Sequence, residues 1–195
     1  MQRTDTDAIL VEAFLKGDDE ALRFLYERHI PGVYNFIART APPEVDVEDI
    51  VQEAFIKAWR SLKGFKRDKN FKTWIFTIAK NTLLDRLKSN RTISFSLLEE
   101  GMGEDGPAFD PADRRPLPDE VLQMFESDKY ASELLGNLKP PSRAVVVMHV
   151  LEDLSFREIG EVLGEPMDTV KTRYRRAIQE LARLLASKPG NEGKF

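Results

Sequence analysis

The sequence predicts an all-α protein in which an acidic, flexible linker joins two small helical domains. Apolar residues recur at spacings of three and four along most of the 195 residues, and no strand-length run alternates apolar with polar residues. Residues 96–120 interrupt this pattern with seven glycines and prolines and with eight acidic residues against two arginines. A stretch of this composition buries too little apolar area to fold alone, so we interpret it as a linker.

The composition limits the classes of function. Hydrophobic residues make up 42% of the chain, which is enough for packed cores, and there is no cysteine. Disulfides, thiolate metal sites and cysteine nucleophiles are therefore excluded. The net charge of −4 argues against nucleic-acid binding by the whole surface, but it allows a local basic face because salt screens distant charges. Acids interrupt the short apolar run near the N-terminus, so we expect neither a signal peptide nor insertion into a membrane.

Two helices are expected to open the first domain. The first spans residues 5–16 and ends at Gly17, since glycine readily adopts a left-handed conformation at a helix end. The second spans residues 20–39 and has two candidate N-caps, Asp18 and Asp19. Pro31 lies inside this second pattern, and we expect it to kink or divide the helix.

The third predicted helix, residues 46–62, is strongly amphipathic. Asp46 is its N-cap, and Asp49 lies at the third helical position, where an acid interacts favourably with the helix dipole. Its apolar stripe is expected in the core and consists of Val47, Ile50, Val51, Ala54, Phe55, Ala58, Trp59 and Leu62. Its opposite face is polar and carries Glu48, Asp49, Gln52, Glu53, Lys57 and Arg60.

A basic and aromatic segment follows and leads into a fourth helix, residues 70–88. Its cations are Lys63, Lys66, Arg67, Lys69 and Lys72, and its aromatic residues are Phe65, Phe71 and Trp74. Such a mixture suits single-stranded nucleic acid, whose bases stack on aromatic rings while cations follow the backbone. The alternative is that Phe71 and Trp74 lie in the core, which is common for aromatic residues at helical spacing.

The second domain is expected to contain a helix-turn-helix. A helix over residues 142–152 follows the stop signal "KPP". Ser155 and Glu158 predict a capping box for the next helix, which ends at Gly164. A long basic helix then starts near Asp168, and a short helix, a glycine turn and a long helix together are the helix-turn-helix plan.

The last helix gathers positive charge near its start. We expect its four cations to be exposed together with Thr172, and these cations are Lys171, Arg173, Arg175 and Arg176. An α-helix fits the major groove of DNA, where its N-terminal residues reach base edges and arginines also bind phosphates. The alternative is an ordinary solvated basic face.

Three stretches in order resemble the bacterial extracytoplasmic-function (ECF, group IV) sigma factors of the sigma-70 family. They read "EALRFLYERHIPGVYNFIAR", "DVEDIVQEAFIKAWRSLKGFKRDKNFKTWIFTIAKNTLLDRLK" and "LSFREIGEVLGEPMDTVKTRYRRAIQEL". The resemblance implies a transcription initiation factor that joins core RNA polymerase, without a cofactor, and directs it to promoters. It implies a sigma-2-like domain over residues 1–94, the linker over residues 95–119, a sigma-4-like domain over residues 120–188 and a tail over residues 189–195.

The resemblance also implies functional residues and partners. Core polymerase, through the clamp helices of its largest subunit, is expected to bind Asp49, Gln52 and Glu53, and the flap of the second largest subunit is a further contact. The melted −10 element is assigned to Lys66, Arg67, Asn70, Asn81 and Arg86, and the −35 duplex is assigned to Thr169, Lys171, Thr172, Arg175 and Arg176. An anti-sigma factor and a cytoplasmic location are implied in the same way.

Two other classes of function fit the sequence less well. An enzyme is disfavoured because His29 and His149 lie in separate helical segments without a motif, and because no phosphate loop, nucleophile elbow or metal spacing occurs. A dimeric helix-turn-helix regulator would account for the C-terminal half alone. The basic-aromatic segment of the first domain distinguishes a sigma factor from such a regulator, since a regulator that binds only duplex DNA does not need this segment.

Overall fold

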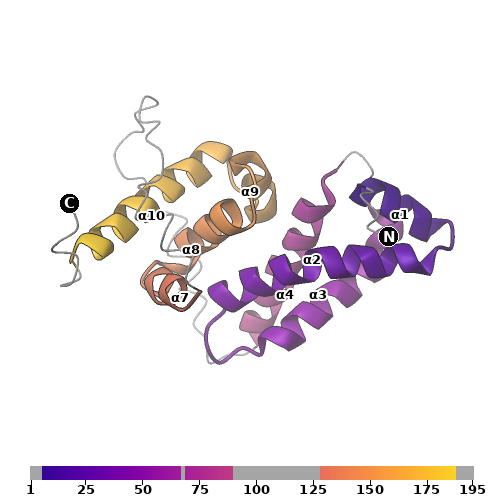
Figure 1. Ribbon diagram of the computed structural model, residues 1–195, viewed down its shortest axis with the longest axis horizontal. Helices are drawn as coiled ribbons and strands as arrows, with labels where there is room; N and C mark the ends of the chain where they lie inside the picture. The colour runs from indigo at the N-terminus through magenta and orange to yellow at the C-terminus, as the bar shows by residue number, and fades with distance from the viewer. Residues whose placement is uncertain (1–5, 67–68, 90–127, 188–195) are drawn as a thin grey trace. The chain divides into compact units, whose positions relative to one another are not determined.

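The computed structural model describes residues 6–66, 69–89 and 128–187, and these residues form helices and turns without a strand (Figure 1). The chain divides into two compact units, with the main boundary between Ile93 and Ser94. The prediction of an all-α protein with two helical domains is therefore confirmed. The predicted linker, its boundaries, the C-terminal tail and Arg67 lie outside the described residues.

The first unit contains four α-helices among its described residues. They are α1 (Asp7–Leu15), α2 (Asp19–Thr40), α3 (Val47–Ser61) and α4 (Phe71–Ser89), with a 3-10 turn at Leu62–Gly64. Helices α2, α3 and α4 pack against one another, and α1 packs against α2. The core between them contains fully buried aromatic side chains, and the rings of Phe36 and Phe76 lie 5.4 Å apart between α2 and α4.

The ends of these helices follow the local signals of the sequence. The side chain of Asp18 accepts a hydrogen bond from the Glu20 amide at 3.1 Å, and that of Asp46 accepts one from the Asp49 amide at 3.1 Å. Gly17 has a φ of +100°, as expected for a residue that ends a helix in a left-handed conformation. These contacts confirm the predicted caps. The caps were predictable because capping depends on residues only two or three positions away.

Of the two outcomes expected for Pro31, a kink or a division of the second helix, division is wrong. Helix α2 is one element of 22 residues with Pro31 inside it. Pro31 itself is exposed, whereas His29 and Val33 on either side of it are buried. Burial of the residues around the proline keeps the two parts of α2 in one helix, and this packing outweighs the hydrogen bond that the proline removes.

The described part of the second unit starts with α7 (Asp128–Gly136) and α8 (Pro140–Val146), and α8 continues into a π-helical turn at Val147–Leu151. The helix predicted to start at residue 142, after "KPP", starts earlier, because Pro140 and Pro141 occupy the first two positions of α8. The amide hydrogens that prolines lack have no intrahelical partner at these positions, so prolines begin a helix well. Arg143 joins α8 to the preceding segment, because its Nη2 donates to the carbonyl oxygens of Gly136 and Leu138, each at 3.0 Å.

Helices α9 (Phe156–Leu163) and α10 (Met167–Ser187) complete the second unit and form the predicted helix-turn-helix (Figure 1). The capping box is confirmed, because the Ser155 amide donates to Glu158 Oε2 at 2.8 Å and the Glu158 amide donates to Ser155 Oγ at 3.3 Å. Glycine is required at Gly160 inside α9 and at Gly164 in the turn. A Cβ on Gly160 would lie 2.7 Å from the Glu165 carbonyl oxygen, and Gly164 has a φ of +74°.

Candidate functional site

The outer face of α3 presents the three residues assigned to core polymerase, Asp49, Gln52 and Glu53, which we call the acidic strip. The apolar stripe of α3 packs into the core, where Ile50, Ala54 and Ala58 are fully buried. Asp49 keeps 60% of its side chain exposed and Gln52 is also exposed, while Glu53 is 39% exposed. The amphipathic pattern therefore turns these three predicted residues to the surface of the first unit.

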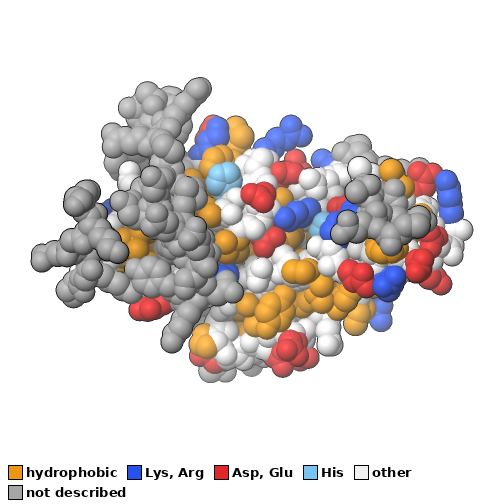
Figure 2. All heavy atoms as spheres, viewed as in Figure 1, with side chains coloured by type: hydrophobic (Ala, Val, Ile, Leu, Met, Phe, Trp, Pro, Cys, Tyr) orange, Lys and Arg blue, Asp and Glu red, His pale blue; other side chains and the backbone are white. Residues whose placement is uncertain are grey.

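Apolar side chains also reach the surface of α2 and α3. The exposed fractions are 36% for Tyr26 and 42% for Tyr34 on α2, and 48% for Ile56 on α3. Figure 2 shows apolar side chains gathered on the visible face of the first unit. Ile56 was not predicted to lie at the surface, although its position four residues after Gln52, on the polar face of α3, was the available signal.

An ion-pair network joins the acidic strip to α4. Arg86 Nη2 lies 3.0 Å from Glu53 Oε2, and Arg86 Nη1 lies 3.8 Å from Asp49 Oδ2. Lys57 Nζ lies 3.0 Å from Glu53 Oε1 and 3.6 Å from Asp85 Oδ2. Hydrogen bonds from Lys57 and Arg86 hold the pKa of the Glu53 carboxyl below its usual value. Arg86, which the resemblance assigns to DNA, thus contacts two residues that it assigns to core polymerase.

The aromatic residues around the basic segment pack on one another. The ring centroid of Phe65 lies 5.6 Å from that of Phe71 and 5.0 Å from that of Trp74, and the Phe71 and Trp74 centroids are 5.5 Å apart. Phe65 and Phe71 are buried and Trp74 is half-buried. This cluster matches the alternative in which Phe71 and Trp74 belong to the core. The exposed residues of the segment are polar or charged, and they include Lys66, Lys69 and Asn70.

Helix α4 carries its predicted DNA-binding residues on different sides. Asn70 precedes the helix and caps it, because its Oδ1 accepts a hydrogen bond from the Thr73 amide at 3.3 Å. Asn81 is exposed, whereas Arg86 turns toward α3. Asn81 and Arg86 are five residues apart, which corresponds to a rotation of about 140° around the helix axis. The structure therefore does not bring Asn81 and Arg86 to one surface.

A second polar cluster ties α1 to α2, and no local pattern in the sequence signals it. His29 Nε2 lies 2.8 Å from Asp7 Oδ2, and Arg28 Nη1 lies 2.6 Å from Asp7 Oδ1. Burial acts to raise the pKa of Asp7, but its hydrogen bonds and electrostatic attraction to His29 and Arg28 outweigh burial and lower that pKa. The buried His29 ring also contacts Phe71, with a centroid distance of 5.1 Å.

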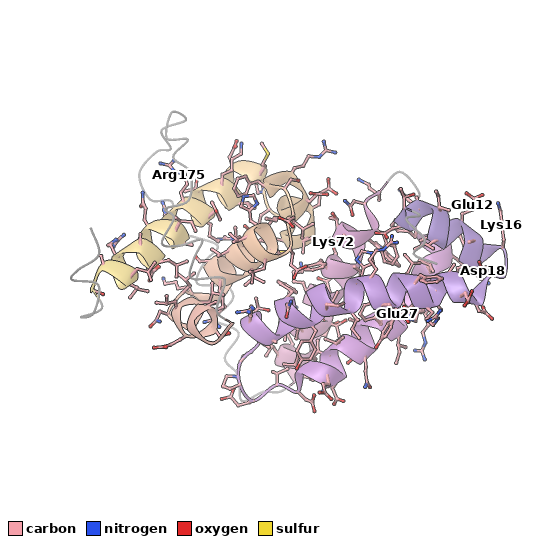
Figure 3. The ribbon with its side chains drawn as sticks, in the orientation of Figure 1. Glu12, Lys16, Asp18, Glu27, Lys72 and Arg175 are labelled. Carbon is pink, nitrogen blue, oxygen red and sulfur yellow. The ribbon has the colours of Figure 1, made fainter. Side chains whose placement is uncertain are left out.

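The first half of α10 presents predicted DNA-binding residues at its surface. Thr169 and Arg176 are exposed, and Lys171, Thr172 and Arg175 are half-buried. Figure 3 shows Arg175 extending from α10 on the side away from α8. Lys171 Nζ lies 3.6 Å from Asp168 Oδ1, an exposed pair that a stronger anionic partner can displace at little cost. These residues come from two consecutive turns of one helix, so a single ligand can contact several of them.

The prediction that Arg173 is exposed is wrong. Its side chain is 9% exposed, and its Nη1 lies 2.5 Å from Glu165 Oε2 in the turn before α10. Arg173 lies three residues after Val170 and four before Ala177, both of which are buried, so it belongs to the inward stripe of the helix. Glu165 compensates the buried charge, and the pair connects α10 to the turn.

An aromatic cluster fixes the inward side of α10. The His149 ring stacks on Phe156 at 4.1 Å, and Tyr174 contacts both rings at 4.8 and 5.1 Å. His149 Nδ1 donates to the Leu154 carbonyl oxygen at 2.8 Å, which joins the π-helical turn to the start of α9. Burial raises the pKa of Tyr174 to about 12, so its hydroxyl stays neutral at physiological pH. The cluster leaves α10 little freedom to rotate.

No group of three or more His, Cys, Asp or Glu side chains among residues 6–66, 69–89 and 128–187 is arranged to hold a metal ion. In the same part of the chain, no helix combines the length and apolar character that crossing a membrane requires.

Comparisons with known proteins match both units. The family model for Sigma-70 region 2 matches residues 25–93, and the model for Sigma-70, region 4 matches residues 129–181. The chain is 32% identical to the RNA polymerase sigma factor CnrH of Cupriavidus metallidurans, over 95% of this chain and 97% of the relative. It is 33% identical to the ECF RNA polymerase sigma-E factor of Escherichia coli, over 90% of this chain and 92% of the relative.

Similar solved structures support the fold. A structure of CnrH in complex with the cytosolic domain of CnrY is 27% identical in sequence, with a TM-score of 0.65, and the match covers 95% of this chain and all of that one. The sigma factor RpoE in complex with the anti-sigma factor NepR from Bartonella quintana matches with a TM-score of 0.61 at 21% identity, over 86% of this chain and 98% of that one.

Proposed function

Because the chain belongs to the ECF sigma factors of the sigma-70 family, we propose that it joins core RNA polymerase and directs it to promoters through two separate DNA-reading surfaces. The protein acts in this proposal as a transcription initiation factor and not as an enzyme. The observation that carries the proposal is α10, whose inward side is fixed by Tyr174 and the Arg173–Glu165 pair while Lys171, Arg175 and Arg176 remain accessible to a ligand.

The second unit reads duplex DNA at the −35 element in this proposal. The first turns of α10 enter the major groove, where Arg176 and Lys171 reach base edges or phosphates. Thr169, Thr172 and Arg175 are neighbours on the same two turns and complete the contact surface. A helix that cannot rotate on its own domain presents these side chains in one register, which favours sequence recognition over non-specific binding.

The first unit reads the melted −10 element in this proposal. Lys66 and Arg67 follow the backbone of the single strand. Asn81 binds an unpaired base, since its amide group both donates and accepts hydrogen bonds. Asn70 contributes to the same surface from the start of α4. The packed aromatic residues support the segment from beneath, since Phe65 and Phe71 are buried.

Core polymerase docks on the acidic strip of α3 in this proposal. Asp49 and Gln52, together with Glu53, face the clamp helices of the largest subunit, and the second unit contacts the flap of the second largest subunit. Complementary charge gives the docked pair its register and a fast association rate more than it gives affinity. We place the protein in the cytoplasm, where core polymerase acts.

An anti-sigma factor is a further proposed partner. The relative CnrH has been solved in complex with the cytosolic domain of CnrY, and the structural neighbour RpoE has been solved with the anti-sigma factor NepR. We infer that a regulatory protein also binds this chain.

The experiment that tests the proposed function is run-off transcription with purified core polymerase on a pool of genomic promoter fragments. We expect a small set of defined transcripts that depends on the added protein. Failure to co-purify with core polymerase, combined with tight and sequence-specific duplex binding by the free protein, would instead identify a helix-turn-helix regulator.

A further inference from the structure

The ion-pair network between α3 and α4 links two surfaces with different proposed ligands. Arg86 on α4 is held by Glu53 at 3.0 Å and faces Asp49 at 3.8 Å, both on α3. Glu53 uses one carboxylate oxygen for Arg86 and the other for Lys57. The charges of the acidic strip are therefore partly compensated from within the protein, and the guanidinium of Arg86 is compensated by the strip.

The partial exposure of this network determines how easily its ion pairs can exchange partners. The side chains of Arg86, Glu53 and Lys57 are 33%, 39% and 39% exposed, so solvent and ligands reach them. An ion pair in such a position contributes on the order of 0–1 kcal/mol to stability, because water solvates the separated charges almost as well. The partners of Arg86 can therefore be exchanged without disturbing the packing of α3 on α4.

Each side of the ion pair can exchange its present partner for a ligand of the same charge as that partner. A cationic surface that docks on the strip competes with Arg86 for Asp49 and Glu53. A guanidinium that has lost its carboxylates binds phosphate well, since its planar donors match two phosphate oxygens. Arg86 lies five residues after Asn81 on α4 and on another side of the helix, so the phosphate that a released Arg86 binds lies outside the surface assigned to Asn81.

We propose that Asp49 and Glu53 mask Arg86 in the free protein, and that a basic partner engaging these two acids releases Arg86 to a phosphate of promoter DNA. This inference rests on the proposed function, which assigns the acidic strip to core polymerase. Occupation of the strip and binding of DNA then favour each other reciprocally, because the same Arg86 pairs oppose both. Arg86 is a conditional DNA contact in this scheme, and Glu53 has a role besides docking.

The first test uses the free full-length protein and a fluorescently labelled single-stranded oligonucleotide at low salt. We expect Glu53→Gln to raise the affinity for the oligonucleotide about fivefold, the size of one typical net hydrogen bond, and to steepen the salt dependence by about 0.7 in slope. The matched control is Glu48→Gln, which removes the same charge from a nearby position of α3. The double variant with Arg86→Gln should return to the wild-type affinity.

A gain in DNA affinity by Glu53→Gln distinguishes masking of Arg86 from a structural role of Glu53, because a damaged fold does not bind DNA more tightly. An equal effect of Glu48→Gln would reduce the result to general charge repulsion and overturn the proposal. A gain that persists in the double variant would show that Arg86 is not the released group.

The second test repeats the comparison in preassembled holoenzyme. Core polymerase already occupies the acidic strip in the holoenzyme. We therefore expect the ratio of the DNA affinities of Glu53→Gln and wild type to fall to about one, and we expect the DNA affinity of both to depend on Arg86. An undiminished ratio would overturn the release step. Holoenzyme assembly by Gln52→Arg tests the docking surface separately, because Gln52 is exposed and carries no charge that could pair with Arg86. Normal assembly of that variant would refute the docking assignment alone.

Discussion

The two units each contain an arginine paired with a glutamate, and the pairs differ mainly in burial. Arg173 and Glu165 in the second unit are 9% and 14% exposed, whereas Arg86 and Glu53 in the first are 33% and 39% exposed. Water cannot replace the partner of a buried charge, so breaking the Arg173 pair is costly, whereas the Arg86 pair is exchangeable. Burial therefore separates an ion pair that supports the fold from one that can respond to a ligand.

The largest effect on stability is expected from Arg173→Met. This change leaves Glu165 as an uncompensated charge in a mostly buried position and should lower the free energy of unfolding by about 2–4 kcal/mol. Both tryptophans, Trp59 and Trp74, lie in the first unit, so hydrogen exchange of α8 to α10 is the appropriate measurement. Adding Glu165→Gln should recover much of the loss. Unchanged protection in the single variant would contradict the assignment of this pair to the fold.

Arg176 lies three residues beyond Arg173 and is exposed, so we expect the opposite behaviour. Arg176→Ala should change the stability by less than about 0.5 kcal/mol but weaken binding of the holoenzyme to a −35 duplex by about 1–3 kcal/mol. The salt dependence should flatten by about 0.9 in slope if the contact is to a phosphate. Titration of labelled promoter duplex at several salt concentrations measures both quantities. Asn81→Ala serves as the control, since it should leave duplex binding nearly intact.

The carboxylate of Asp7 lies between those of the two arginine pairs in burial, because its side chain is 21% exposed against 14% for Glu165 and 39% for Glu53. Asp7→Asn should destabilise the first unit by about 1–2 kcal/mol at pH 7. The pKa of Asp7 is lower in the folded state than in the unfolded state, so its contribution is present above the unfolded pKa of about 3.9. It is lost as the pH falls through the folded pKa.

Urea unfolding followed by tryptophan fluorescence at pH 7 and at lower pH tests this linkage. The difference between wild type and Asp7→Asn should shrink on acidification. A difference that is independent of pH would show that the lost hydrogen-bond acceptor oxygen matters and the charge of the carboxylate does not. Glu12→Gln, which removes an exposed pair with Lys16 on the same helix, is the control.

Glu53→Gln is expected to have a small effect on stability. The loss of a half-exposed pair should lower the stability of the first unit by about 0–1 kcal/mol, measured by the same urea unfolding experiment. A loss as large as that caused by Arg173→Met would show that the α3–α4 network supports the fold, and it would remove the distinction between the two pairs.

Local sequence was sufficient to specify several helix caps and the helix-turn-helix. Asp18, Asp46 and the Ser155–Glu158 box were predictable because capping joins residues two or three positions apart, and Gly164 because its left-handed conformation suits glycine. The amphipathic pattern of α3 likewise predicts that Asp49 and Gln52 lie on the surface, as they do. These signals are local, so they do not depend on how the helices pack.

Which charged side chains meet was decided by the packing of the helices. Arg86 and Glu53 are 33 residues apart in the chain, and His29 and Asp7 are 22 apart, so no local pattern announces either pair. The prediction for Arg173 gave its charge more weight than its spacing to Val170 and Ala177, which places it on the inward stripe. Whether an arginine binds a ligand or a carboxylate depends on which helices pack together, because an ion pair forms only where packing brings the two charges within a few ångströms of each other.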